Sequence, residues 1–116
     1  MIPVAAREAQ RKEREVSKIT VLGGGLVGRV IARELAREPD FRVTVADGAE
    51  GTRARLAAEG LATIALDFAD DAAVRRAVAD ADVVVGAAPG HMGYRLLRLV
   101  IEAGKPYADI AFMPED

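Results

Sequence analysis

Apolar residues recur along the chain in two alternating patterns, short continuous runs and longer stretches with helical spacing. The first run, Ile19–Leu22, is rich in β-branched residues and has the length of a strand. After three glycines, Val27, Ile31 and Leu35 fall four positions apart, and Val30 joins them. This spacing places the four side chains on one face of a helix. We therefore expect a buried strand followed by an amphipathic helix that buries this face.

The same alternation continues to the end of the chain. The predicted strands cover residues 19–22, 43–46, 62–66, 83–85 and 107–110, and the predicted helices cover residues 26–38, 50–59, 70–79 and 91–103. In the last helix, the residues expected to be buried are Leu96, Leu97, Val100 and Ile101. Short connections with right-handed crossovers give a parallel sheet with helices on both faces. We predict an α/β fold, a doubly wound parallel sheet of the Rossmann type with strand order 3-2-1-4-5.

Length, charge and composition narrow the class of protein. The 116 residues suit one domain, which we place at residues 18–116, after a charged N-terminal extension at residues 1–17. A formal net charge of −2 and 4% aromatic residues disfavour a nucleic-acid surface, and no apolar run approaches the length of a membrane span. The chain has no cysteine, which excludes disulfides and thiolate metal sites. Because the N-terminus lacks the features of a secretory signal, we expect a cytoplasmic protein.

Gly23, Gly25 and Gly28 stand in G-x-G-x-x-G spacing between the first predicted strand and the first predicted helix. Gly23 lets the chain turn sharply out of the strand, Gly25 lets a diphosphate approach the main chain, and Gly28 lets the helix pack closely on the strand. The helix start then offers unpaired N–H groups and the positive end of its dipole to an anion. The pattern predicts a dinucleotide-binding loop. The alternative is a glycine-rich turn that serves packing alone.

An acidic residue at the end of the second predicted strand completes this pattern. Asp47 lies nineteen positions after Gly28, where a carboxylate accepts hydrogen bonds from the adenosine ribose hydroxyls. A carboxylate there repels the 2′-phosphate of NADP, and Gly48 and Ala49 beside it offer no arginine to reverse that preference. The predicted cofactor is therefore NAD rather than NADP. Arg53, one turn into the next helix, leaves NADP open as the alternative.

Further candidate residues follow the third and fourth predicted strands, at the same carboxyl edge. Asp67 is placed to meet the adenine, although a solvated loop acid fits its position as well. Two small residues and a proline follow the fourth predicted strand, at Ala87, Ala88 and Pro89. They either leave room for the nicotinamide ribose or form a tight strand-to-helix loop. His91, the single histidine, lies at the start of a predicted helix. It is either a catalytic acid–base group or an ordinary exposed residue. No metal cluster and no nucleophile–base pair is legible, so the catalytic residues stay unknown.

From residue 18 to its end, the sequence resembles the NAD(P)-binding domain of the saccharopine dehydrogenase-like family, which includes lysine 6-dehydrogenases. The stretches that carry the resemblance are ITVLGGGLVGR at 19–29, VTVAD at 43–47, the 67–69 region, ADVVV at 81–85, IEAGKP at 101–106 and YADIAFMPED at 107–116. The cofactor contacts that the resemblance implies are Gly23, Gly25, Leu26, Val27, Gly28, Asp47, Asp67, Phe68, Ala87, Ala88 and Pro89.

The resemblance also implies a function. Family members are pyridine-nucleotide oxidoreductases that act at the C–N bond of amino acids such as lysine or saccharopine. The 116 residues correspond to the first third of a full-length member and lack its second domain, which shapes the substrate pocket and carries dimerisation. We therefore expect a cofactor domain that is inactive alone and meets its amino-acid substrate only with that second domain; a homodimer is left open. The alternative is a stand-alone nucleotide-sensing regulatory domain of the type that gates potassium transport.

Overall fold

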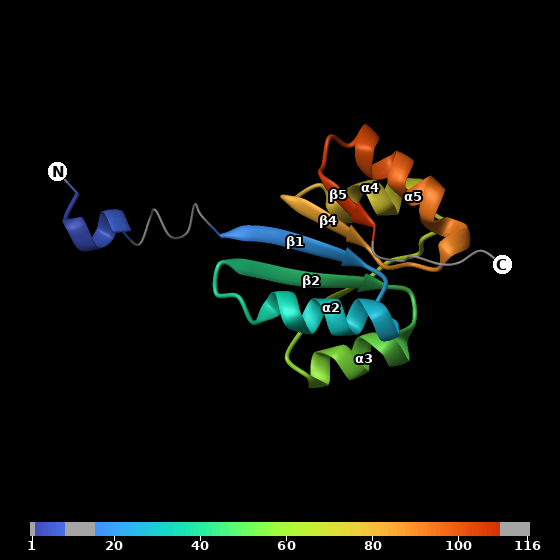
Figure 1. The fold of residues 1–116 in the computed structure, drawn as a ribbon, viewed down its shortest axis with the longest axis horizontal. Helices are drawn as coiled ribbons and strands as arrows, with labels where there is room; N and C mark the ends of the chain where they lie inside the picture. Colours follow the sequence, from blue (N-terminus) through green and yellow to red (C-terminus); the bar gives the residue numbers. More distant parts are fainter. Residues whose placement is uncertain (1, 9–15, 110–116) are drawn as a thin grey trace.

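The computed structural model describes residues 2–8 and 16–109. Its strands are β1 (Ser17–Leu22), β2 (Phe41–Asp47), β3 (Ala62–Ala65), β4 (Val83–Gly86) and β5 (Tyr107–Asp109), and the helices between them are α2 (Leu26–Ala36), α3 (Glu50–Ala58), α4 (Asp71–Val78) and α5 (Gly90–Glu102). Neighbouring strands are parallel, and their order in the sheet is β3-β2-β1-β4-β5 (Figure 1). The predicted doubly wound topology is confirmed.

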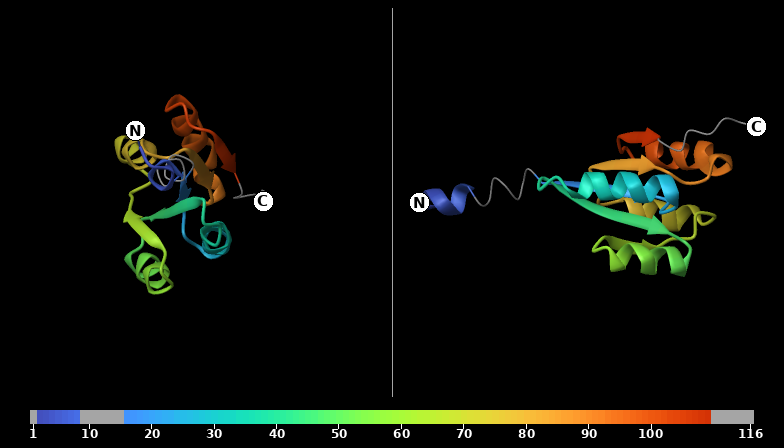
Figure 2. Two further views of the ribbon diagram at one scale, coloured as in Figure 1. Left: turned by 90° about the vertical axis from the view of Figure 1, so that its left-hand side faces the viewer. Right: turned by 60° about the horizontal axis from the view of Figure 1, so that its bottom comes forward.

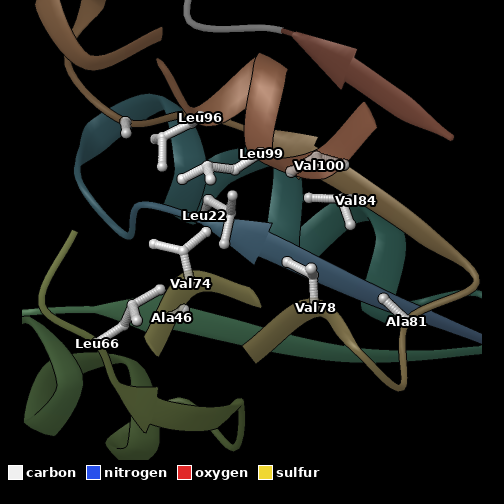
Figure 3. Packing of buried hydrophobic residues seen from close by; sticks show 11 residues of the cluster. Leu22, Ala46, Leu66, Val74, Val78, Ala81, Val84, Leu96, Leu99 and Val100 are labelled. Carbon is white, nitrogen blue, oxygen red and sulfur yellow. The ribbon is translucent and has the colours of Figure 1, made fainter. Parts of the chain in front are cut away.

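Helices cover both faces of the sheet, α2 and α3 on one side and α4 and α5 on the other (Figure 2). Because successive strand residues point to opposite faces, Val21 of β1 packs toward α2 and α3, whereas its neighbour Leu22 packs toward α4 and α5. On this second face, Leu22 meets Val74 of α4 and Leu96 of α5 in one apolar cluster (Figure 3). Burial on both faces explains why the central strands are continuous apolar runs.

The apolar faces of two helices differ from the prediction. In α2 the predicted Ile31 and Leu35 pack against the core beside the buried Gly28 and Ala32, while Val27 and Val30 are 52% and 46% exposed. One turn apart, the two small residues let the helix axis approach the sheet, and this turns the valines outward. In α5, Ile101 is 60% exposed rather than buried. That helix carries a nearly continuous apolar run, from which spacing alone does not select the buried side.

Where the structure describes them, the element ends fall within two residues of the prediction. α2 ends at Ala36 rather than at residue 38, because the N–H groups of Arg37 and Glu38 bond carbonyls three residues back, at 3.2 and 3.1 Å. Residues 4–8 form a short helix, drawn apart from the sheet in Figure 1. The predicted division into an extension and a domain stays a prediction, because residues 9–15 lie outside the described part. Within residues 2–8 and 16–109, no helix has the length and apolarity needed to cross a bilayer.

Candidate functional site

The candidate residues gather at the carboxyl edge of the sheet. There α2, α3, α4 and α5 all begin, directly beyond the ends of the preceding strands (Figure 1, right-hand side). The strand register pairs Leu22, at the end of β1, with Ala46 of β2 and Gly86 of β4. Three strand-to-helix loops are therefore neighbours in space. Doubly wound folds bind their ligands at this edge.

Glycines build the loop between β1 and α2 for two different reasons. Gly23 has φ = +108°, a conformation that favours glycine, and a Cβ there would lie 2.7 Å from the carbonyl oxygen of Ala87. A Cβ on Gly28 would fall onto the carbonyl oxygen of Gly23. Gly25 differs from both, because its backbone is extended and a Cβ there would have no heavy atom within 4 Å. Packing therefore does not require a glycine at position 25, which borders open space.

The start of α2 carries unpaired backbone donors. Gly25 is the N-cap, no side chain accepts a hydrogen bond at this cap, and the first turn contains no acidic residue. The first N–H groups of a helix have no carbonyl partner within the helix. Leu26 and Val27, the first two helical residues, have exposed side chains. Together with the positive end of the helix dipole, this start favours a bound anion.

The carboxylate of Asp47 ties the end of β2 to the glycine loop. One of its oxygens accepts the N–H of Gly24 at 2.7 Å, and the other accepts the N–H of Ala49 at 2.8 Å. Each carboxylate oxygen has two lone pairs, so both keep acceptor capacity for a ligand. The guanidinium of Arg53 donates to the main-chain carbonyl of Asp47 at 2.9 Å. The structure thus places a carboxylate beside the glycine loop and an arginine beside the same residue.

Gly24 is a site residue that the spacing pattern did not single out. Its N–H holds the Asp47 carboxylate, and a Cβ there would lie 2.7 Å from Cδ1 of Leu56 and 3.2 Å from Cγ2 of Thr52. The glycine loop therefore packs on α3 as well as on the loop after β4. The signal in the sequence is the unbroken run of three glycines, because the G-x-G-x-x-G pattern accounts for the outer two and not for the middle one.

The loop after β4 lies against the glycine loop. The N–H of Ala87 bonds the carbonyl of Leu22 at 2.8 Å, and the Cβ of Ala87 lies 3.1 Å from where a Cβ on Gly28 would be. Ala88 is buried in the apolar cluster on the α4–α5 face, while Pro89 is the exposed N-cap of α5. The structure thus places Ala87 beside the glycine loop, whereas Ala88 packs into the apolar cluster.

The segment after β3 lies one strand further away. Leu66 donates its N–H to the carbonyl of Asp47 at 3.2 Å, which fixes the segment beside β2. The exposed Asp67 uses one carboxylate oxygen to accept the N–H of Ala69 at 2.9 Å, a local turn. Phe68 is half-buried and packs against the apolar cluster of α4 and α5. Within residues 16–109, no hydrogen bond joins Asp67 or Phe68 to the glycine loop.

Two ionisable side chains lie near the start of α5. His91, its second residue, is exposed and makes no side-chain hydrogen bond to another described residue. The ring of Tyr107 lies over Gly86, where a Cβ would meet the phenol oxygen. Burial, with a smaller contribution from the carboxylate of Asp109, raises the pKa of Tyr107 to about 12. Its hydroxyl is therefore protonated at neutral pH. No three His, Asp or Glu side chains within the described residues form a group that could hold a metal ion.

A doubly wound sheet whose first strand leads through glycines into an uncapped helix, with an acid at the end of the neighbouring strand, defines a dinucleotide-binding domain. The family model described as "Saccharopine dehydrogenase NADP binding domain" matches residues 19–116, and the chain belongs to this family. The resemblance seen in the sequence is confirmed. The family description names NADP, however, where Asp47 predicts NAD.

Solved structures share this fold, and one of them is a saccharopine dehydrogenase. Saccharopine dehydrogenase (L-Glu forming) from Saccharomyces cerevisiae superposes with a TM-score of 0.75 at 27% identity, over 84% of this chain and 22% of the yeast chain. AtPrR2, solved with NADP+ and (+)pinoresinol, gives 0.67 at 25% identity, over 80% of this chain and 36% of its own. A short-chain dehydrogenase/reductase (wide type) from Veillonella parvula DSM 2008, in complex with NADP, shares the fold with a TM-score of 0.64 at 20% identity, over 80% of this chain and 46% of its own. This chain thus spans less than half the length of each of these proteins.

Proposed function

We propose that the chain binds a pyridine dinucleotide at the carboxyl edge of its sheet and is the cofactor domain of an oxidoreductase that acts on the C–N bond of an amino acid such as lysine or saccharopine. The observation that carries the proposal is the start of α2, where bare main chain at Gly25 borders open space and unpaired N–H groups. A diphosphate fits this place because it needs both close approach to the backbone and backbone donors.

Each part of the edge has a role in this proposal. The N–H groups at the start of α2 hold the diphosphate, and the Asp47 carboxylate accepts the ribose hydroxyls. The residues proposed to border the two ends of the dinucleotide are Asp67 and Phe68 at the adenine, and Ala87, Pro89 and the main chain of Ala88 at the nicotinamide. When bound, the nicotinamide ring supplies a carbon that accepts or donates hydride. The contribution of the described residues is to bind and orient it.

We further propose that the unphosphorylated cofactor, NAD, is preferred. The Asp47 carboxylate is held in place by the N–H groups of Gly24 and Ala49, so its negative charge is fixed beside the proposed ribose site. A 2′-phosphate brought to this place meets a like charge, whereas ribose hydroxyls meet an acceptor.

The position of Arg53 favours NADP as a second candidate for the cofactor. Its guanidinium already lies at the main chain of Asp47, and the family is described by NADP. An arginine near the ribose is the usual way in which this fold accommodates a 2′-phosphate. Under this candidate, Arg53 exchanges its bond to the Asp47 carbonyl for bonds to the phosphate.

We assign substrate binding to protein regions beyond this domain. Hydride transfer needs the substrate held against the nicotinamide in a near-attack geometry. The carboxyl edge offers one wall of such a site, and the chain spans 22% of the yeast saccharopine dehydrogenase that it matches. The activity on an amino acid is therefore proposed for the longer protein, with this domain as its cofactor-binding part.

Thermal unfolding and titration calorimetry with NADH test the proposed site. A ligand at 100 times its Kd stabilises a protein by about 2.7 kcal/mol, so we expect a clear rise in Tm. Gly25→Val should abolish this rise while the domain stays folded, because the Gly25 backbone is extended. Ala72→Val adds bulk at the exposed second residue of α4 and should bind NADH like the wild type. Full affinity in Gly25→Val would contradict the proposal.

The same measurement with NADPH separates the two cofactors. A larger rise in Tm with NADH than with NADPH supports NAD. If NADPH gives the larger rise in Tm and Arg53→Ala removes the difference between the two cofactors, NADP is the preferred cofactor instead. Arg55→Ala, which removes an exposed arginine of the same helix that does not bond Asp47, is the matched control and should leave the preference unchanged.

A further inference from the structure

A cavity lies at the opposite end of the sheet from the glycine loop. It has a volume of about 280 Å³ and is open on the face that α4 covers in part. Its floor comes from the first residues of β1 and β2, and its wall comes from the last turn of α4. On this face the strands change character along their length. Toward the carboxyl edge they carry Leu22 and Ala46, which are buried, whereas the amino halves carry polar and charged side chains.

The floor of the cavity places two cations side by side. Lys18 and Arg42 are register partners on the neighbouring parallel strands β1 and β2. Adjacent strands lie about 4.8 Å apart, and like charges opposite each other in a sheet are destabilising. The two cations are exposed, whereas the next pair on the same face, Thr20 and Thr44, is less exposed, polar and uncharged. A bound anion would offset the repulsion.

A third cation faces the first two. Arg76 of α4 lines the same cavity, and no ion pair or side-chain hydrogen bond joins Arg76, Lys18 or Arg42 to another described residue. Elsewhere on the surface, four arginines pair with a carboxylate, Arg33, Arg37, Arg95 and Arg98, whereas the exposed Arg75 has no ion pair with another described residue.

Nearby acids do not balance the three cations of the cavity. Asp80 is the one acid among the residues that line it, and it leaves a surplus of positive charge. Asp82, on the adjoining loop, directs its carboxylate to the backbone N–H of Lys18 at 2.8 Å rather than to a side chain. The cavity thus presents more cationic donors than the described residues use.

We propose that this cavity binds a compact oxyanion with two or more negative charges, such as a diphosphate or a phosphate ester. Guanidinium groups bond phosphate oxygens in pairs, and the paired hydroxyls of Thr20 and Thr44 add donors on the floor. The volume lies near the lower end of small-molecule sites, which favours a small ligand over a macromolecular segment. The site is separate from the dinucleotide site and does not rest on that proposal.

Titration calorimetry with inorganic pyrophosphate, at constant ionic strength, tests the inference. Arg76→Ala should weaken binding about tenfold or more, because it removes a charge-assisted bond. Arg75→Ala, which removes the neighbouring exposed arginine that does not line the cavity, is the matched control and should leave the affinity unchanged. Arg42→Thr should act like Arg76→Ala. No heat of binding with the wild type, or an equal loss in Arg75→Ala, would overturn the proposal.

Pyrophosphate could instead occupy the start of α2, so the two sites need to be separated. Gly25→Asp places a negative charge at that start and should leave pyrophosphate binding to the cavity intact. In NMR titration of this variant, the backbone amides of residues 18–20 and 42–44 should shift. Loss of pyrophosphate binding in Gly25→Asp, or shifts confined to residues 23–28, would assign the anion to the glycine loop and refute the second site.

Discussion

Two helices that begin at the same edge of the sheet, α2 and α4, deal with their unpaired N–H groups in opposite ways. At α4 the Asp70 side chain accepts the N–H of Ala73 at 3.1 Å, and Asp71 puts a second carboxylate in the first turn. At α2 the cap is Gly25, without a side-chain bond and without an acid in the first turn. The physical requirement is the same at both starts. One helix satisfies it with its own carboxylates, whereas α2, like α5, has neither a side-chain cap nor an acid in its first turn.

The comparison shows that a helix start can either stabilise the ligand-free domain or keep its N–H groups available for an anion. A helix that caps itself gains stability in the ligand-free domain, but its carboxylates repel a phosphate. A helix that stays uncapped gives up that gain and keeps its donors free for an anion. Variants at the starts of α2 and α4 test whether the comparison is correct.

The largest effect is expected at Gly28, the third residue of α2. Gly28→Ala forces a Cβ onto the main-chain carbonyl of Gly23. Because backbone cannot yield as a side chain can, we expect a loss of about 3 kcal/mol in the free energy of unfolding, the upper end for overpacking. Urea unfolding measures it. As a control, Gly51→Ala in α3 meets no atom within 4 Å and should stabilise by about 0.4–1 kcal/mol. A Gly28→Ala domain as stable as the wild type would show that α2 is not held against the loop.

A smaller effect is expected from removing the cap of α4. Asp70→Ala leaves the N–H of Ala73 unpaired, and we expect a loss of about 1 kcal/mol in the free energy of unfolding. NADH affinity should stay within twofold of the wild type, because this helix start is not assigned to the ligand. Asp40→Ala, at an exposed acid in the turn before β2, provides the control for loss of charge. Weakened NADH binding in Asp70→Ala would remove the distinction between the two helix starts.

The smallest effect on stability is expected when α2 receives a cap like that of α4. Gly25→Asp supplies an acceptor and a charge that suits the dipole, so the free energy of unfolding should rise by about 0.3–1 kcal/mol. The same carboxylate repels a diphosphate, and NADH binding should fall more than a hundredfold. Thermal unfolding with and without NADH measures both quantities in one sample. A variant that is stabilised and still binds NADH would show that the ligand does not use this start.

Much of this architecture follows from local sequence patterns. The strand order is predicted because apolar runs and helical spacing alternate along the chain. The roles of Gly23 in the turn and of Gly28 in close helix packing also follow from the G-x-G-x-x-G spacing alone. The exposed sides of α2 and α5 do not, because Val27, Val30 and Ile101 are apolar like their buried neighbours. Which side of such a helix is buried depends on how closely it approaches the sheet.

Contacts between strands are the part that sequence patterns leave out. The bond from Gly24 to Asp47 joins residues 23 positions apart and requires β1 and β2 to be adjacent. The fit of Tyr107 over Gly86 depends on the register of β4 against β5. The like-charged pair of Lys18 and Arg42 likewise appears only once the register of two strands is known. Each of these features is a property of pairing, and no local pattern encodes it.

The bond between the Asp47 carboxylate and the Gly24 N–H has a consequence for any redesign of this domain. A single side chain fastens the loop and sets the charge beside it, so a change in the charge also changes the fastening. Even Asn, the neutral residue of the same shape, has one acceptor oxygen where Asp47 uses two, so the N–H of Gly24 or of Ala49 would lose its acceptor. A redesign would first have to supply another hydrogen-bond acceptor for the Gly24 N–H, and only then change the charge beside the loop.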